Sequence, residues 1–264
     1  MSMSVEWQSP HDGTLRRGIS WRELVNEAAR MLGYEDPDLL RVRGDDLQIL
    51  EYFRIKHNDE MAELRNWFNI EINAPDAALL NSPIHAALAG LDKCRLFYTT
   101  NYDDFLERGL RLHGRASKAI ALEAHIADLL IEESDGAIDH AQVIKFHGDL
   151  NNPRRMVLSE SDYERRLSFS DVEDQRLKSD LLGRALLFLG YSFRDWNVSY
   201  LFRLVNDYFG PLPQAPTGRR AYIAVSDPSD FEYTLFRARN IEVLPIATAT
   251  QTEDTADLLR SLAG

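Results

Sequence analysis

Hydrophobic and polar residues follow a helical period in the first third of the chain. Residues 19–32 place apolar side chains on one face of a helix, and Ser20 stands where an N-cap residue belongs. Two further helical patterns cover residues 47–72 and 76–91, and no strand pattern lies between them. The sequence therefore predicts a helical section over residues 20–91.

From residue 94 onwards, short apolar runs of strand length alternate with helical patterns. The apolar runs are residues 94–100, 118–122, 141–148, 185–192, 220–226 and 241–247. Apolar strands separated by helices are typical of a parallel sheet that is covered on both faces. We therefore predict an α/β fold with a Rossmann-like parallel sheet, forming a single domain over residues 1–264. Residues 45–91 are expected to form a helical insertion near its N-terminus.

Composition narrows the classes of function. The 264 residues include 30 Lys and Arg against 42 Asp and Glu, and the resulting net charge of -12 repels nucleic acid and anionic membrane surfaces. The single cysteine, Cys94, cannot form an internal disulfide or a four-thiolate zinc site, which fits a reducing cytoplasm. No apolar run approaches the ~18 residues of a membrane span. We expect a cytoplasmic protein without a metal and without direct nucleic-acid or membrane contact.

Polar residues and glycines follow three of the predicted strands. The residues that leave these strands are Thr99, Thr100, Asn101, Tyr102 and Asp103, then His147, Gly148 and Asp149, then Gly190, Tyr191 and Ser192 with Arg194 and Asp195 close behind. Turns use such residues for capping and for positive φ, so a single polar exit indicates only a turn. In parallel sheets, however, ligands bind at the carboxyl ends of the strands. Three polar exits in succession therefore predict a ligand site.

Three segments resemble the core motifs of a known family. They are LFYTTNYDDFLERGL at 96–110, VIKFHGDLNNPRRMVLSESDY at 143–163 and LLFLGYSFRDWNV at 186–198. In this order they resemble the motifs of the sirtuin-like NAD hydrolases of prokaryotic anti-phage defence, and the resemblance extends over about residues 20–246. They are also similar to the sirtuin deacylases, but Thr100 replaces the deacylase glutamine and the zinc ribbon is missing. The resemblance therefore implies an NAD glycohydrolase rather than a deacylase.

The resemblance also implies roles for individual residues. Asn101 would hydrogen-bond the attacking water or the ribose near its anomeric carbon, because an amide both donates and accepts. His147 would contact ribose hydroxyls and act as a general base or proton relay, because an imidazole titrates near neutral pH. The residues implied to bind NAD are Thr100, Asp103, Gly148, Gly190, Tyr191, Ser192 and Asp195, with no metal among the cofactors. Asp195 could instead cap the helix that follows it.

The sequence departs from this family near its N-terminus. The family opens with an apolar strand and a Gly-Ala-Gly-x-Ser turn that holds the NAD pyrophosphate. Residues 1–21 contain only Gly13 and Gly18 and no apolar strand run, so either the sequence is truncated or the phosphate loop has degenerated. Arg16 and Arg17 could replace the turn by charge. The alternative function is therefore a module that binds or senses NAD or an ADP-ribose derivative without turnover.

A third hypothesis makes the chain a partner-binding subunit whose helices in residues 45–91 mediate assembly. The helical section presents an apolar stripe formed by Leu47, Leu50, Phe53, Met61, Leu64, Trp67 and Phe68. Such a stripe is more often core than interface. The expected partners are NAD or a related nucleotide, and a homo-oligomer or a defence-system protein is a further candidate.

Overall fold

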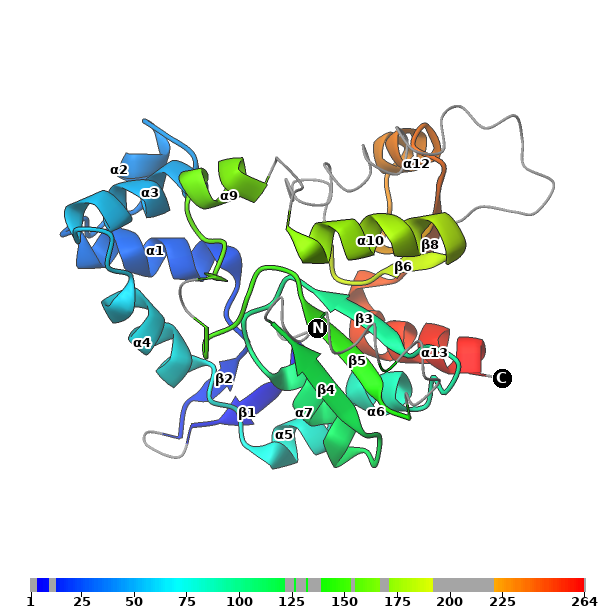
Figure 1. Ribbon diagram of the computed structural model, residues 1–264. Coiled ribbons are helices and arrows are strands. Elements are labelled where there is room, and N and C mark those ends of the chain that lie inside the picture. The colour runs from blue at the N-terminus through cyan, green and yellow to red at the C-terminus, as the bar shows by residue number, and fades with distance from the viewer. Residues whose placement is uncertain are drawn as a thin grey trace.

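The architecture is built on parallel strands with helices around them (Figure 1). The computed structural model describes residues 4–9, 13–121, 126, 132, 139–152, 155–166, 171–191 and 221–263. The first sheet has the order β3-β5-β4, formed by β3 (Leu96–Thr99), β5 (Ala141–Lys145) and β4 (Ser117–Ile120). The second has the order β6-β7-β8, formed by β6 (Leu186–Phe188), β7 (Ala221–Ser226) and β8 (Ile241–Ile246).

All neighbouring strands within these two sheets are parallel, which confirms the predicted α/β class. The prediction of a single sheet differs from what the described residues show. Within them no ladder joins β3 to β6, and a cavity lies between these two strands. The parallel pairing of the strands and the helices on both faces are nevertheless typical of a Rossmann-like fold.

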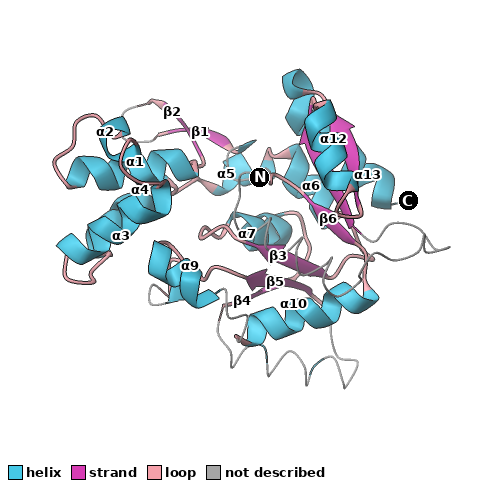
Figure 2. Cartoon of the chain, turned by 90° about the horizontal axis from the view of Figure 1, so that it is seen from above, coloured by secondary structure: helices cyan, strands magenta, loops and turns pink. Residues whose placement is uncertain are grey.

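Helices cover the first sheet on opposite faces because its side chains alternate in direction. Phe97 and Val143 pack with α6 (Pro83–Ala89), α7 (Phe105–Leu112) and α13 (Gln251–Ala263). Tyr98 and Phe146 pack instead with α10 (Val172–Gly183) and α12 (Asp230–Arg237). Viewed from above, α6 and α13 lie on one side of the β3-β5-β4 strands and α10 lies on the other (Figure 2).

A buried polar cluster fastens α10 to β3. The Tyr98 hydroxyl donates to Asp180 at 2.6 Å, and the same carboxylate accepts from Arg176 at 2.8 Å and from Arg184 at 3.1 Å. Burial, followed by the adjacent Asp180 charge, raises the pKa of Tyr98 well above its usual range. Tyr98 therefore stays protonated and keeps donating to Asp180 across the gap between strand and helix.

The predicted helical section is confirmed, with more breaks than the hydrophobic pattern indicated. It contains α1 (Trp21–Met31), α2 (Asp38–Arg41), α3 (Asp46–Lys56), α4 (Ala62–Glu71), α5 (Asp76–Leu80) and α6. Ser20 caps α1 as predicted, in a capping box with Glu23. The single pattern over 47–72 divides into α3 and α4 because Asn58 and Asp59 adopt positive φ.

The apolar stripe of the helical section is mostly core, as interpreted from the sequence. Leu50, Phe53 and Leu64 are at most 1% exposed, and Phe68 is also buried. They share one cluster with Tyr102, Phe105, Met156 and Leu158, which belong to the segments that follow β3 and β5. The helical section is therefore packed directly on the loops that leave the first sheet.

A two-stranded antiparallel hairpin precedes α1, which corrects the prediction that no strand lies there. Its strands are β1 (Glu6–Gln8) and β2 (Leu15–Arg17), with Gly13 at positive φ between them. Trp7 is 6% exposed and meets the ring of Phe105 edge-on at 6.1 Å. Three-residue strands are too short to produce an alternation that can be recognised in the sequence.

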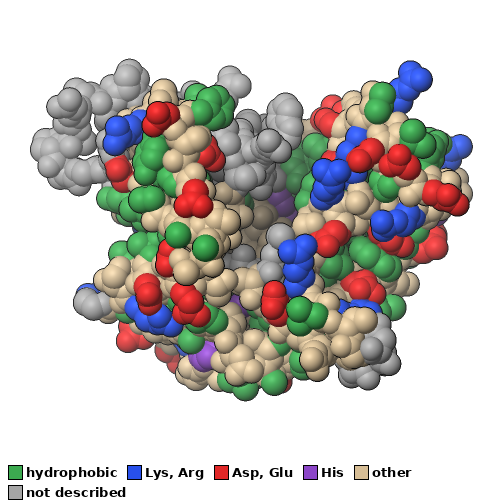
Figure 3. Space-filling view, turned by 180° about the vertical axis from the view of Figure 1, so that it is seen from behind, with side chains coloured by type: hydrophobic (Ala, Val, Ile, Leu, Met, Phe, Trp, Pro, Cys, Tyr) green, Lys and Arg blue, Asp and Glu red, His purple; other side chains and the backbone are tan. Residues whose placement is uncertain are grey.

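The exposed surface carries charges of both signs. Seen from behind, Lys and Arg side chains are interspersed with Asp and Glu, and no continuous basic area covers this face (Figure 3). None of the helices in the described part of the chain has the length and apolar character needed to cross a membrane.

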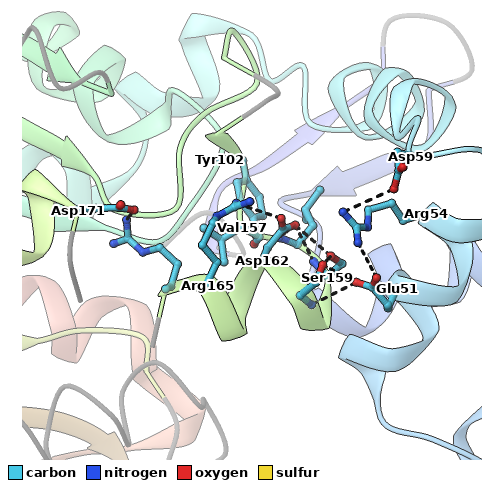
Figure 4. Close-up of polar contacts among 12 residues, drawn as sticks. Glu51, Arg54, Asp59, Tyr102, Val157, Ser159, Asp162, Arg165 and Asp171 are labelled. Atoms are coloured by element: carbon cyan, nitrogen blue, oxygen red, sulfur yellow. Dashed lines mark hydrogen bonds and ion pairs between the residues drawn. The ribbon is translucent and has the colours of Figure 1, made fainter. Parts of the chain in front are cut away.

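Polar contacts join the helical section to α9 (Glu160–Arg166), the helix that follows the β5 exit (Figure 4). Glu51 on α3 accepts from the Ser161 amide at 3.2 Å, from the Ser161 hydroxyl at 2.9 Å and from Arg54 at 2.6 Å. Partial burial acts to raise the pKa of Glu51, but the hydrogen bonds from Arg54 and the two serines Ser159 and Ser161 outweigh it and lower the pKa to about 2.

The packing of α7 on α6 leads to a prediction. A Cβ at Gly109 would lie 2.3 Å from Cδ2 of the buried His85 ring. Gly109→Ala is therefore expected to lower the free energy of unfolding by about 1–3 kcal/mol in urea titrations, although alanine favours a helix over glycine. The matched control is Gly183→Ala on α10, where a Cβ would meet no atom within 4 Å. Equal stability of the two variants would contradict this packing.

The contact between α3 and α9 predicts a pH-dependent contribution to stability. Because the pKa of Glu51 is lowered to about 2 in the folded protein, its contribution is present above about pH 4.5 and is lost as the pH falls toward 2. Glu51→Gln should cost about 1 kcal/mol of unfolding free energy at pH 7, and the difference should shrink below pH 4.5. Denaturant titrations from pH 7 to pH 3 measure it. Glu27→Gln, which breaks an exposed pair with Arg30, serves as control.

Candidate functional site

The paired register of β3 and β5 brings two of the predicted exits together. Thr99 is the partner of Lys145, and the Phe146 amide donates to the Thr99 carbonyl at 2.9 Å. Asn101 follows Thr99 by two residues, and His147 follows Lys145 by two. The chain therefore leaves both strands at the same edge of the sheet, and each of the two predicted catalytic residues follows the last pair of the ladder by two residues.

The turn after β3 is fixed by local hydrogen bonds. The backbone N–H of Asn101 donates to the Thr99 hydroxyl at 3.1 Å, and the backbone N–H of Phe105 donates to the Asp103 carboxylate at 3.1 Å. Asp103 is 7% exposed, and its hydrogen bond from Phe105 holds the first turn of α7 in place. Asn101 is half-buried and precedes this helix by four residues, and the N-cap position is occupied by Asp104.

His147 lies in a packed position after β5. It is 3% exposed, and its ring contacts Phe146 and Tyr163, each with ring centroids 5.7 Å apart. Tyr163 comes from α9, so the helix that contacts α3 also forms one wall around the imidazole. His147 therefore contributes to packing as well as standing at a strand exit.

Gly148 is required by the path of its own chain. It adopts φ +75°, and a Cβ there would lie 2.6 Å from the backbone oxygen of Arg155. The segment around Arg155 returns beside Gly148, and it is held there because the Val157 amide donates to the His147 carbonyl at 3.1 Å. The Tyr102 hydroxyl also donates to the Val157 carbonyl at 2.6 Å (Figure 4). The first exit and the returning loop are thus tied together above the sheet.

The third exit meets the first through two side chains. Gly190 adopts φ +71° after β6, and the Tyr191 hydroxyl lies 3.4 Å from the Thr100 hydroxyl. Tyr191 also meets the ring of Phe188 edge-on at 5.9 Å. Thr100 and Tyr191, predicted from separate motifs, are therefore neighbours. Ser192 and Asp195 lie outside the described residues.

Two cavities flank the exits of β3 and β5. A cavity of about 450 Å³ lies between β3 and β6 and is bordered at the exit end by Thr99, Thr100 and Tyr191. A smaller one of about 180 Å³ is bordered by Gly148 and by charged residues that include Arg155 and Arg166. The larger volume is in the range of small-molecule sites. The linings of these two cavities reach the residues next to Asn101 and His147 but do not include those two side chains.

A buried charged pair beneath the exits was missed by the sequence reasoning. The Lys145 side chain is 0% exposed, its ammonium donates to the Asp103 backbone carbonyl, and it lies 3.3 Å from a carboxylate oxygen of Glu107. Burial raises the pKa of Glu107, although the Lys145 charge acts to lower it. The one available signal was a lysine at the end of a strand run that is apolar apart from Gln142.

The N-terminus of α1 presents a carboxylate. Glu23 accepts from the Ser20 amide at 2.7 Å and from the Ser20 hydroxyl at 2.6 Å. Arg17 lies 3.5 Å from Glu23, and Arg16 lies 2.7 Å from Glu71. The two arginines considered as replacements for the phosphate turn therefore both stand beside glutamates. Among the residues that the structure describes, no three His, Cys, Asp or Glu side chains gather as a metal site requires.

Comparison with known proteins identifies relatives of the chain. The model of the SIR2-like domain matches residues 95–244. NAD(+) hydrolase ThsA of Bacillus cereus (strain MSX-D12) is 22% identical over 197 residues, which cover 72% of this chain and 37% of that protein. NAD(+) hydrolase ThsA of Acinetobacter baumannii (strain 532279) is 28% identical over 192 residues, covering 72% and 36%. Defense-associated sirtuin 2 of Bacillus subtilis is 23% identical over 154 residues, covering 57% and 14%.

The match to the domain model includes all three predicted motifs and both strands whose exits form the candidate site. The chain spans little more than a third of the length of the ThsA relatives, 37% and 36% in the two cases above. Because the matched residues make up more than half of its length, the chain belongs to the SIR2-like domain family.

Proposed function

We propose that this domain hydrolyses NAD at the nicotinamide–ribose bond and acts in prokaryotic anti-phage defence. Its relatives are named NAD(+) hydrolases and a defence-associated sirtuin. The observation that supports the proposal is the pairing of Thr99 with Lys145, because Asn101 and His147 each follow this pair by two residues on leaving the sheet. A neutral amide and an imidazole at a shared edge suit the attack of water on a sugar.

The reaction assigns a separate task to each residue. The bond between the ribose anomeric carbon and the nicotinamide nitrogen breaks, and its electron pair leaves with nicotinamide. The oxygen of a water forms the new bond to the anomeric carbon, and its proton passes to His147. Asn101 orients that water by accepting from it and donating to the ribose. The products are nicotinamide and ADP-ribose.

The remaining candidates would surround the substrate. Thr100 and Tyr191, which lie 3.4 Å apart at their hydroxyls, would contact the ligand from the exits of β3 and β6. Asp103 would act through the turn that holds Asn101, since its carboxylate already accepts from the Phe105 amide. Gly148 and Gly190 would allow close backbone approach, and Ser192 with Asp195 would complete the third exit.

A second function, binding or sensing without turnover, is favoured by one specific observation. The α1 N-terminus carries the Glu23 carboxylate in its first turn, bonded to the Ser20 amide and hydroxyl. A carboxylate there occupies donors and the positive end of the helix dipole that a pyrophosphate would use. Ribose contacts could then persist while phosphate contacts are weak.

Removal of the two catalytic candidates tests the hydrolase proposal. Asn101→Ala and His147→Ala should each reduce nicotinamide release from NAD at least 100-fold, measured by chromatography of the reaction mixture. Because His147 is packed against Phe146 and Tyr163, its alanine variant should also melt at lower temperature. His147→Gln preserves more of this packing and should lose turnover equally. Turnover that survives all three substitutions would remove the proposed site.

The affinity for NAD separates the two functions. In a chain that lacks the glycine turn, three or four phosphate contacts of about 1 kcal/mol each would be missing, which corresponds to about two to three powers of ten in affinity. Calorimetry on the 264-residue chain should therefore give a dissociation constant no tighter than roughly millimolar. Micromolar binding would show that another segment supplies the phosphate contacts and would contradict the weakened-binding alternative.

A further inference from the structure

The buried Lys145 lies where the two catalytic candidates are connected. It is the last residue of β5, its side chain is 0% exposed, and His147 follows two residues later. Its ammonium donates to the backbone carbonyl of Asp103, two residues after Asn101. A single side chain thus bridges the strand that leads to one candidate and the turn that contains the other.

Burying this ammonium requires compensation. A lysine withdrawn from water is strongly unfavourable unless an opposite charge and good acceptors surround it. Here Glu107 supplies the charge at 3.3 Å, and the Asp103 carbonyl supplies an acceptor. The compensation is incomplete, because the second Glu107 oxygen, Oε2, is buried and has no hydrogen-bond partner among the described residues. An apolar residue would fill this position at lower cost, so packing alone does not account for the lysine.

Other contacts already hold the outer side of the same turn. The Leu150 amide donates to the Tyr102 carbonyl at 3.4 Å, and the Tyr102 hydroxyl donates to the Val157 carbonyl at 2.6 Å. These bonds connect the turn to the loop beyond His147, whereas the Lys145 contact connects it to the strand beneath. The turn is therefore held on one side by the loop beyond His147 and on the other side, toward β5, by the Lys145 ammonium.

We propose that Lys145 is a positioning residue that sets the placement of Asn101 relative to His147 through its bond to the Asp103 carbonyl. This inference rests on the proposed hydrolase function for its catalytic consequence, although the placement itself can be measured without NAD. Small displacements of reacting groups reduce turnover strongly, so the loss of this contact should act on kcat more than on KM.

The test compares variants that separate charge compensation from position. Lys145→Met alone leaves Glu107 as a buried charge without its partner and should lower the melting temperature by about 5 °C or more. Lys145→Met combined with Glu107→Leu removes both charges and should melt within about 3 °C of the wild type. The double variant still lacks the bond to Asp103. We expect its kcat for NAD to stay at least tenfold below the wild-type value, with KM changed by less than about threefold.

Hydrogen exchange of the peptide covering residues 99–105 supplies the readout that is independent of NAD. Its amides should exchange at least about threefold faster in the double variant than in the wild type. Arg115→Met is the matched control, because Arg115 also donates to backbone carbonyls, those of Leu88 and Cys94, but at the opposite end of β3. It should lower the melting temperature while leaving kcat within twofold and the exchange of 99–105 unchanged.

The outcomes distinguish this inference from the proposed function. If the wild type releases no nicotinamide, the hydrolase proposal fails and the exchange rates alone decide the role of Lys145. A double variant with wild-type turnover and exchange would overturn the inference, as would an equal loss of turnover in Arg115→Met. If neither Lys145→Met variant folds, Glu107→Gln decides. It keeps the bond to Asp103, so a tenfold increase in the exchange of 99–105 would refute the positioning role.

Discussion

The pairing of β3 with β5 is the constraint on which the candidate site depends. Backbone hydrogen bonds fix Thr99 opposite Lys145, and the Phe146 amide continues the ladder one step further. In a strand, a shift of one residue reverses which face every side chain occupies. Such a shift of β5 would move Val143 away from α7 and would turn the Lys145 ammonium toward the apolar layer that contains Phe146 and Tyr98. The same register therefore satisfies the core and aligns the two strand exits.

The helical section belongs to this scaffold rather than lying beside it. Tyr102, Phe105, Met156 and Leu158 come from the two exits, yet they are buried in the cluster formed by α1, α3 and α4. Glu51 adds polar contacts from α3 to the start of α9, which presents Tyr163 to the His147 ring. The position of His147 thus depends on helices that precede it by about a hundred residues in sequence. A boundary of an insertion at residues 45–91 stays a prediction, because packing here is continuous.

The features that the sequence predicted are those that depend on local pattern. Apolar runs located the six strands of the two parallel sheets, and Ser20 before an amphipathic segment located the start of α1. What could not be predicted depends on partners distant in sequence. Lys145 is buried only because Glu107 and the Asp103 carbonyl receive it, and Gly148 is required because Arg155 returns against it. The β1–β2 hairpin was not predicted for another reason, since strands of three residues carry too little periodicity.

Hydrolysis and binding make different demands on two separate parts of the molecule. The proposed ribose chemistry would use Asn101 and His147 at the β3 and β5 exits, where the strands pair, Lys145 contacts the Asp103 carbonyl and Tyr163 of α9 packs on the His147 ring. Phosphate recognition by a helix N-terminus requires free amides and a positive field, and at α1 the Glu23 carboxylate opposes both. Since the two proposed tasks fall to different residues, weak phosphate binding would raise the NAD concentration needed for turnover. It would not disturb the groups proposed to perform the reaction.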